Sequence, residues 1–155
     1  MVPTNGHARH DSPLSSATHG HPDSCAHSVQ FYTDDAFLVD SLGRFVGESL
    51  RADDVGVVIA TRAHRDGLAT RMRELGVDVD RAIREGRYVS RDAAETLSLF
   101  MRDGWPDATA FADVVGAMIA RAASDGRRVV AFGEMVALLC ADGKPDAAVR
   151  LEDLW

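Results

Sequence analysis

Short apolar segments alternate with longer amphipathic segments from Ser28 to the end of the chain, and this alternation restricts the fold more than any other feature. The stretch VGVVIA, Val55 to Ala60, is apolar at every position, which is typical of a parallel strand covered on both faces. Strands separated by helices imply right-handed crossovers and helices packed on both sides of the sheet. The predicted fold class is α/β, with a mostly parallel sheet of at least four strands and helices on both faces.

The predicted order of elements is β-α-β-α-β-α-α-β-α-α. The four predicted strands are SVQFY (residues 28–32), VGVVIA (55–60), RYVSR (87–91) and RVVAF (128–132). Helical spacing of apolar residues or capping signals predict helices over residues 37–50, 61–76, 79–84, 93–101 and 111–122, followed by two helical segments at the C-terminus. The sequence DGWPD, residues 103–107, is expected to break the helix before it, because glycine and proline both oppose its continuation.

Length and composition indicate one domain preceded by a tail. The chain has 155 residues, of which 46% are hydrophobic and 26% charged, enough for one compact core and too little for two ordinary domains. Residues 1–26 are rich in His, Ser and Pro and lack an apolar period, so we expect a disordered tail. The predicted domain spans residues 27–155. The tail's histidines match no common structural zinc spacing.

The charge and the cysteine content limit which partners and which cellular compartment are expected. The formal charge is −7, and Lys144 is the only lysine, so a nucleic-acid partner is not expected, since phosphate binding needs a clustered basic face. No apolar run approaches the roughly 18 residues of a membrane span, and no signal peptide is recognisable. Cys25 and Cys140 lie far apart in sequence, and a structural disulfide is not expected. These features favour a cytoplasmic protein without membrane or nucleic-acid partners; a homo-oligomer is left open.

Polar residues follow each predicted strand. The carboxyl ends of parallel strands share one edge of a sheet, and ligands bind there. The candidate ligand-binding residues at this edge are Tyr32, Asp35, Thr61, His64, Asp92, Glu95 and Glu134. Glycines and a lysine that would hold phosphate are absent after the first predicted strand. The edge is therefore expected to bind something other than a nucleotide phosphate.

Several of these residues have a second interpretation. Thr61 and Asp92 are also good helix caps. His64 lies one turn into a predicted helix, where it is either a site residue or simply exposed. Glu134 stands between an apolar strand and the apolar run MVALL, and a carboxylate buried there needs a partner.

Five blocks of the sequence resemble one known family. They are HSVQFYTDDAFL, VVIATRAHRDGL, GRYVSRDAAETLSLFM, DGWPDATAF and the C-terminal RRVVAFGEMVALLCADGKPDAAVRLEDLW. In order and spacing they are similar to the MEDS domain, the sensory domain named for methanogens and methylotrophs, from about His27 to the C-terminus. The positions that correspond to the family's motif residues are His27, Tyr32, Asp35, Thr61, His64, Asp92, Glu95, Gly133 and Glu134.

The resemblance implies a bacterial, non-catalytic module that senses a small molecule. It implies a degenerate fold of the RecA and KaiC type without a phosphate-binding loop, and a standalone member that passes its signal to a partner such as a histidine kinase or a transcription regulator. Neither the ligand nor a cofactor is identified by it. Cys140 stands where family members often have an aromatic residue.

Two other functions remain open at this point. The acids Asp34, Asp35 and Asp92 with Lys144-Pro145 resemble the pattern of a phosphoacceptor receiver domain, in which the acids would hold Mg²⁺ and Asp92 would accept the phosphoryl group. Against this, Lys144 follows a helix end rather than an apolar strand. A small α/β enzyme is the other alternative, since His64, Glu95 and Glu134 could support acid/base chemistry.

Overall fold

A three-stranded parallel sheet forms the centre of the protein in a computed structural model, which describes residues 34–155. The strand order is β2 (Tyr88–Asp92), β1 (Val55–Ala60), β5 (Val129–Gly133). Val57 of β1 lies opposite Val89 on one side and Ala131 on the other. These are three of the four predicted strands. The fourth, at residues 28–32, lies outside the described residues, as do Tyr32 and the predicted tail.

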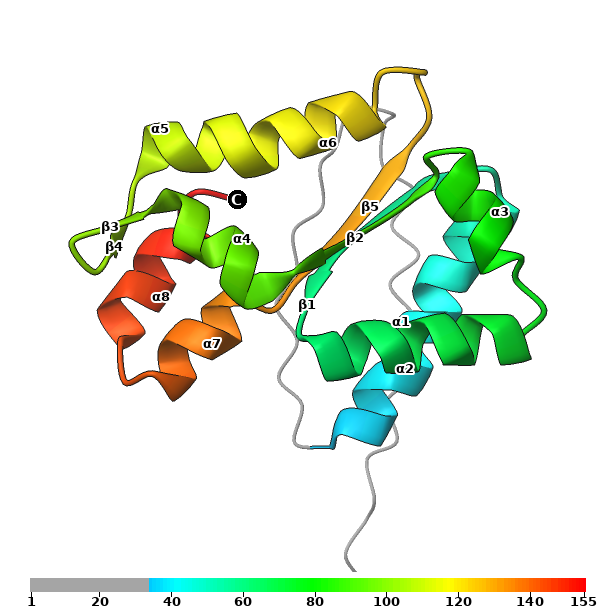
Figure 1. The fold of residues 1–155 in the computed structure, drawn as a ribbon, viewed down its shortest axis with the longest axis horizontal. Coiled ribbons are helices and arrows are strands. Elements are labelled where there is room, and N and C mark those ends of the chain that lie inside the picture. Colours follow the sequence, from blue (N-terminus) through cyan, green and yellow to red (C-terminus); the bar gives the residue numbers. More distant parts are fainter. Residues whose placement is uncertain (1–33) are drawn as a thin grey trace, which may run out of the picture.

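Nine helical segments among residues 34–155 connect and cover these strands. They are α1 (Asp35–Arg51), α2 (Arg62–Glu74), α3 (Val79–Arg84), α4 (Ala93–Phe100), α5 (Ala108–Phe111), a π-helical turn η1 (Ala112–Gly116), α6 (Ala117–Ala122), α7 (Met135–Ala141) and α8 (Pro145–Glu152). Figure 1 shows α4 to α8 on one side of the sheet and α1 to α3 on the other. None of the helices in this part of the chain is long and apolar enough to cross a membrane.

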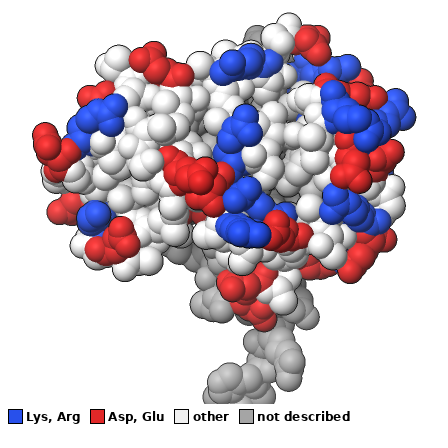
Figure 2. All heavy atoms as spheres, viewed as in Figure 1, with Lys and Arg blue, Asp and Glu red and all other residues white. Residues whose placement is uncertain are grey.

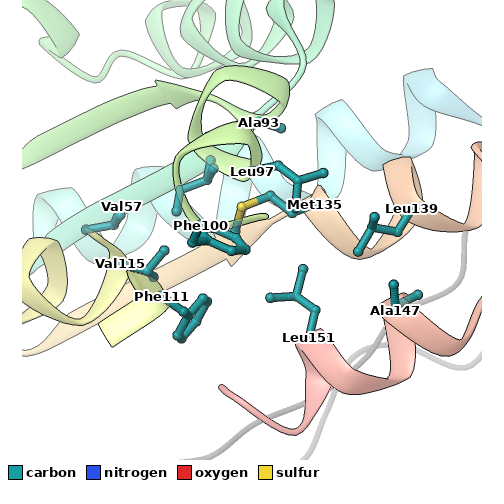
Figure 3. Close-up of a cluster of buried hydrophobic side chains, with 12 residues drawn as sticks. Val57, Ala93, Leu97, Phe100, Phe111, Val115, Met135, Leu139, Ala147 and Leu151 are labelled. Atoms are coloured by element: carbon teal, nitrogen blue, oxygen red, sulfur yellow. The ribbon is translucent and has the colours of Figure 1, made fainter. Parts of the chain in front are cut away.

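The two faces of β1 supply two separate hydrophobic cores. Val57 and Ile59 pack against α4 to α8, and this core includes Phe100 and Leu151 (Figure 3). Val58 and Ala60 point to the opposite face and pack against α1, α2 and α3. Because successive side chains of a strand alternate between faces, a strand that is apolar throughout satisfies both cores. The prediction of a sheet covered on both faces is confirmed.

Gly56 allows α1 to lie directly on β1. A Cβ atom at this position would stand 2.9 Å from Cγ1 of Val46 on α1, closer than real Cβ atoms approach. The helix is therefore packed against the bare backbone of the strand.

The segment DGWPD forms a small hairpin rather than a plain loop. Met101–Arg102 (β3) pairs antiparallel with Trp105–Pro106 (β4). The two residues of the turn, Asp103 and Gly104, have φ of 50° and 85°, and such Asp-Gly turns match the twist of a hairpin. The predicted helix break is confirmed, and the hairpin is an addition to the predicted element order.

Candidate functional site

The carboxyl ends of the three strands bring Thr61, Asp92 and Glu134 to one edge of the sheet. Thr61 directly follows β1, Asp92 ends β2, and Glu134 directly follows β5. The backbone amide of Glu134 donates a hydrogen bond to the carbonyl of Ile59 on β1, at 2.9 Å. This bond extends the pairing of β5 with β1 by one residue and fixes the Glu134 side chain beside the start of α2.

Glu134 is a buried carboxylate whose two oxygens both have partners. Its residue is 3% exposed. Oε2 accepts the backbone amide of Thr61 at 2.6 Å, and Oε1 contacts Nδ1 of His64 in a short hydrogen bond. A buried charge requires such contacts, because without them its desolvation would cost several kcal/mol. The expectation of a buried, partnered carboxylate at this position is confirmed.

His64 connects three elements of the fold. It lies in the first turn of α2, and its side chain is only 12% exposed. Nδ1 contacts Glu134, while Nε2 lies 3.5 Å from Oδ1 of Asp35, the first residue of α1. Asp35 itself is well exposed. The simple interpretation of His64 as an exposed helix residue is therefore wrong, and the chain Asp35, His64, Glu134 runs from the surface into the core.

Asp92 caps α4 and also pairs with an arginine. Its Oδ1 accepts the amides of Ala94 and Glu95 at 3.0 and 3.1 Å, and its Oδ2 lies 2.9 Å from Nη2 of Arg65. Nε of Arg65 donates to the carbonyl of Ala60. The amide of Glu95, followed by the guanidinium of Arg65 and the amide of Ala94, lowers the pKa of the Asp92 carboxyl. Sequence reasoning missed Arg65, and only the side-by-side placement of β1 and β2 reveals it.

Of the remaining predicted residues, Thr61 caps a helix and Glu95 is exposed to solvent. Oγ1 of Thr61 accepts the His64 amide at 3.4 Å and caps α2, so its capping interpretation is confirmed. Glu95 is exposed in the first turn of α4. The amides of Ala36 and Phe37 at the start of α1 are bonded to the carboxylate of Asp34, where a phosphate loop would need them free.

These contacts make the edge a compact polar cluster with both signs of charge. Figure 2 shows acidic and basic side chains side by side near the middle of the displayed face, where α2 and α4 begin. Within residues 34–155, no three His, Cys, Asp or Glu side chains are grouped so as to hold a metal ion. The ammonium of Lys144 lies 3.6 Å from Asp142, while Asp92 pairs with Arg65. This arrangement does not support the receiver hypothesis, in which Lys144 would serve Asp92.

The charge of Asp92 should stabilise the fold in a way that depends on pH. We expect Asp92→Asn, which retains capping ability, to lower the free energy of unfolding at pH 7 by about 1 kcal/mol through loss of the charged contacts with Arg65 and α4. Because folding lowers the pKa of Asp92, the wild-type advantage is full above the unfolded pKa of about 3.9 and disappears as the pH falls through the folded pKa.

Urea unfolding of both proteins between pH 7 and pH 2.5 checks this. The control is Asp107→Asn, a cap of α5 that has no ion pair with any described residue, for which a smaller difference is expected. A wild-type advantage that persists unchanged at the lowest pH would contradict the assignment.

The fold and site define a class: an α/β protein with a polar cluster of both signs of charge at the carboxyl edge of a parallel sheet. The family model described as MEDS, MEthanogen/methylotroph, DcmR Sensory domain, matches residues 26–155. The chain therefore belongs to the MEDS family of sensory domains, and the family predicted from the sequence is confirmed. Comparison with curated proteins and with solved structures gave no match.

Proposed function

We propose that this MEDS domain is a non-catalytic module that binds a small molecule at the carboxyl edge of its sheet and relays its occupancy to a signalling partner such as a histidine kinase or a transcription regulator. The family supplies the sensory role. The observation that carries the location is the chain of contacts from exposed Asp35 through His64 to buried Glu134.

A ligand at this edge has polar groups available to it and a route into the core. Asp35 and Glu95 are exposed, and the imidazole Nε2 of His64 is only 3.5 Å from Asp35. A ligand that competes with Asp35 for this nitrogen changes the contact between α1 and α2. Glu134 joins the same imidazole to the beginning of α7. Differential binding to two arrangements of these helices is what a relay requires.

A thermal-shift screen against a metabolite library tests the proposal without a prior choice of ligand. A true ligand should stabilise the protein by mass action, by about 2.7 kcal/mol at a hundredfold excess over its Kd. We expect Asp35→Asn and His64→Gln to remove most of that shift, because both change the groups offered at the edge. Asp113→Asn, which alters an exposed acid of η1 in the opposite helical layer, should leave the shift unchanged. A stabiliser that acts equally on all three variants binds elsewhere.

One contact favours an enzyme as the second candidate. A buried carboxylate that holds Nδ1 of a histidine orients the imidazole for proton transfer at its other nitrogen. Glu134 holds His64 in this manner, and Nε2 of His64 faces Asp35. The fate of the stabilising compound found in the screen distinguishes a sensor from an enzyme. A sensor returns the compound unchanged after prolonged incubation, as judged by mass spectrometry. An enzyme converts it, and His64→Gln stops the conversion.

A further inference from the structure

A shallow groove runs between α4 and α7. It has a volume of about 440 Å³, and its walls are Ala94, Leu97, Ser98 and Met101 from the α4 side and Leu138, Leu139 and Asp142 from the α7 side, with Gly104 and Lys144 at one end. A second hollow of about 290 Å³ adjoins it, and Gly104 and Lys144 line both. The two hollows meet at these shared residues, next to the tip of the β3–β4 hairpin, and are together called the depression.

The shape of this depression suits a segment of protein better than a small molecule. Small-molecule sites enclose most of their ligand, whereas more than half of the residues lining the larger hollow are themselves exposed. Trp105, which lines the second hollow, is 53% exposed. An exposed tryptophan beside an apolar groove is typical of surfaces that receive an amphipathic helix.

The charges around the depression indicate which sign of charge a docked helix would carry. Lys144, which lines both hollows, is already paired with Asp142. Glu95, Asp103 and Asp146 form no ion pair with any described residue and stand beside or on its walls. Arg102 is the nearest unpaired base on the hairpin. In Figure 2 an uncharged area covers α4, with charged side chains around its border. The rim is therefore net negative, as is the whole chain at −7.

We propose that the groove between α4 and α7 docks a basic amphipathic helix of a partner protein. The apolar face of the partner helix lies on Leu97, Met101 and Leu138 and against Trp105, while the Lys or Arg residues of that helix face the acidic rim. Opposite charge at the rim speeds encounter and favours this partner over acidic ones. Apart from Glu95, which lies beside both, this surface is separate from the ligand cluster, and the proposal requires no assumption about the ligand. This surface supplies the contact through which the domain reaches its partner.

The test uses the full chain and two fluorescein-labelled synthetic helices, one of leucine and lysine and its twin with glutamate in place of lysine. Fluorescence anisotropy measures both Kd values at low and high salt. We expect the lysine helix to bind at least about tenfold more tightly than its twin, and added salt to weaken it. The variant Trp105→Ala should raise its Kd by at least about tenfold, since hot-spot side chains carry most of an interface's affinity.

The matched control is Ile83→Ala, which removes a side chain of similar exposure from α3 on the opposite helical layer and should leave the Kd unchanged. Three results would overturn the proposal: equal binding of the two helices, equal effects of the groove and Ile83 variants, or a wild-type dimer in sedimentation that the groove variant dissociates. The last result would assign the groove to a second copy. No metabolite is used in this test, so a failed ligand screen would not bear on the proposed docking of a helix.

Discussion

Phe100→Ala is expected to lower the free energy of unfolding by about 3–5 kcal/mol, the range for removing a large aromatic side chain from a core. Phe100 is the last residue of α4 and is fully buried. Its ring meets Phe111 edge to face, with centroids 5.3 Å apart, and Phe111 in turn meets Trp155 at 5.5 Å. The substitution therefore removes an aromatic contact between α4 and α5 and leaves a cavity beside Phe111, the residue on which Trp155 packs.

Chemical unfolding in urea measures this loss, and the neighbouring residue provides its control. Leu99 is one position away on the same helix and 56% exposed, so Leu99→Ala should change stability by no more than about 0.5 kcal/mol. Should Phe100→Ala prevent folding altogether, Phe100→Leu gives a smaller, measurable loss. Similar costs at the two positions would mean that α4 does not present Phe100 to the core as described.

Glu134→Gln is expected to destabilise the protein by about 2–3 kcal/mol, although it preserves the shape of the side chain. The carboxylate accepts the Thr61 amide and contacts His64, and charge-assisted bonds in a buried site are stronger than neutral ones. Glutamine has a single acceptor oxygen, and its NH₂ group must face one of these two partners. Denaturant unfolding at pH 7 measures the effect, with Glu48→Gln, an exposed position on α1, as the control.

A double-mutant cycle measures how much of the stability lost in Glu134→Gln comes from the contact with His64. If the contact with His64 carries much of the loss, Glu134→Gln and His64→Gln should be non-additive by at least about 1 kcal/mol. Strict additivity would show that His64 contributes nothing to holding the carboxylate. The Glu134 effect would then belong to the Thr61 amide alone.

Local features of the site were predictable from the sequence because each depends on neighbouring residues. Thr61 and Asp92 follow strands and begin helices, and they cap them. Glu134 stands between two apolar runs and is buried. The apolar stretch Val55–Ala60 forms the central strand. In each case a short sequence contains the whole physical reason.

The pairings across the edge depend on strand order, which no local pattern contains. Arg65 meets Asp92 because β1 and β2 are neighbours, and Glu134 reaches His64 because β5 lies on the other side of β1. The sequence also predicted a helix break at DGWPD but not the hairpin, since glycine and proline signal a turn without specifying what pairs beyond it.

The most direct test of the sensory site is a calorimetric titration of the stabilising metabolite against wild type, His64→Gln and Glu134→Gln, each confirmed to be folded at the temperature used. If the contacts from Asp35 through His64 to Glu134 form the site, both variants should bind at least about tenfold more weakly than wild type, a change of about 1.4 kcal/mol. If both bind with wild-type affinity, the cluster is a structural support for the sheet edge, and the ligand site lies elsewhere.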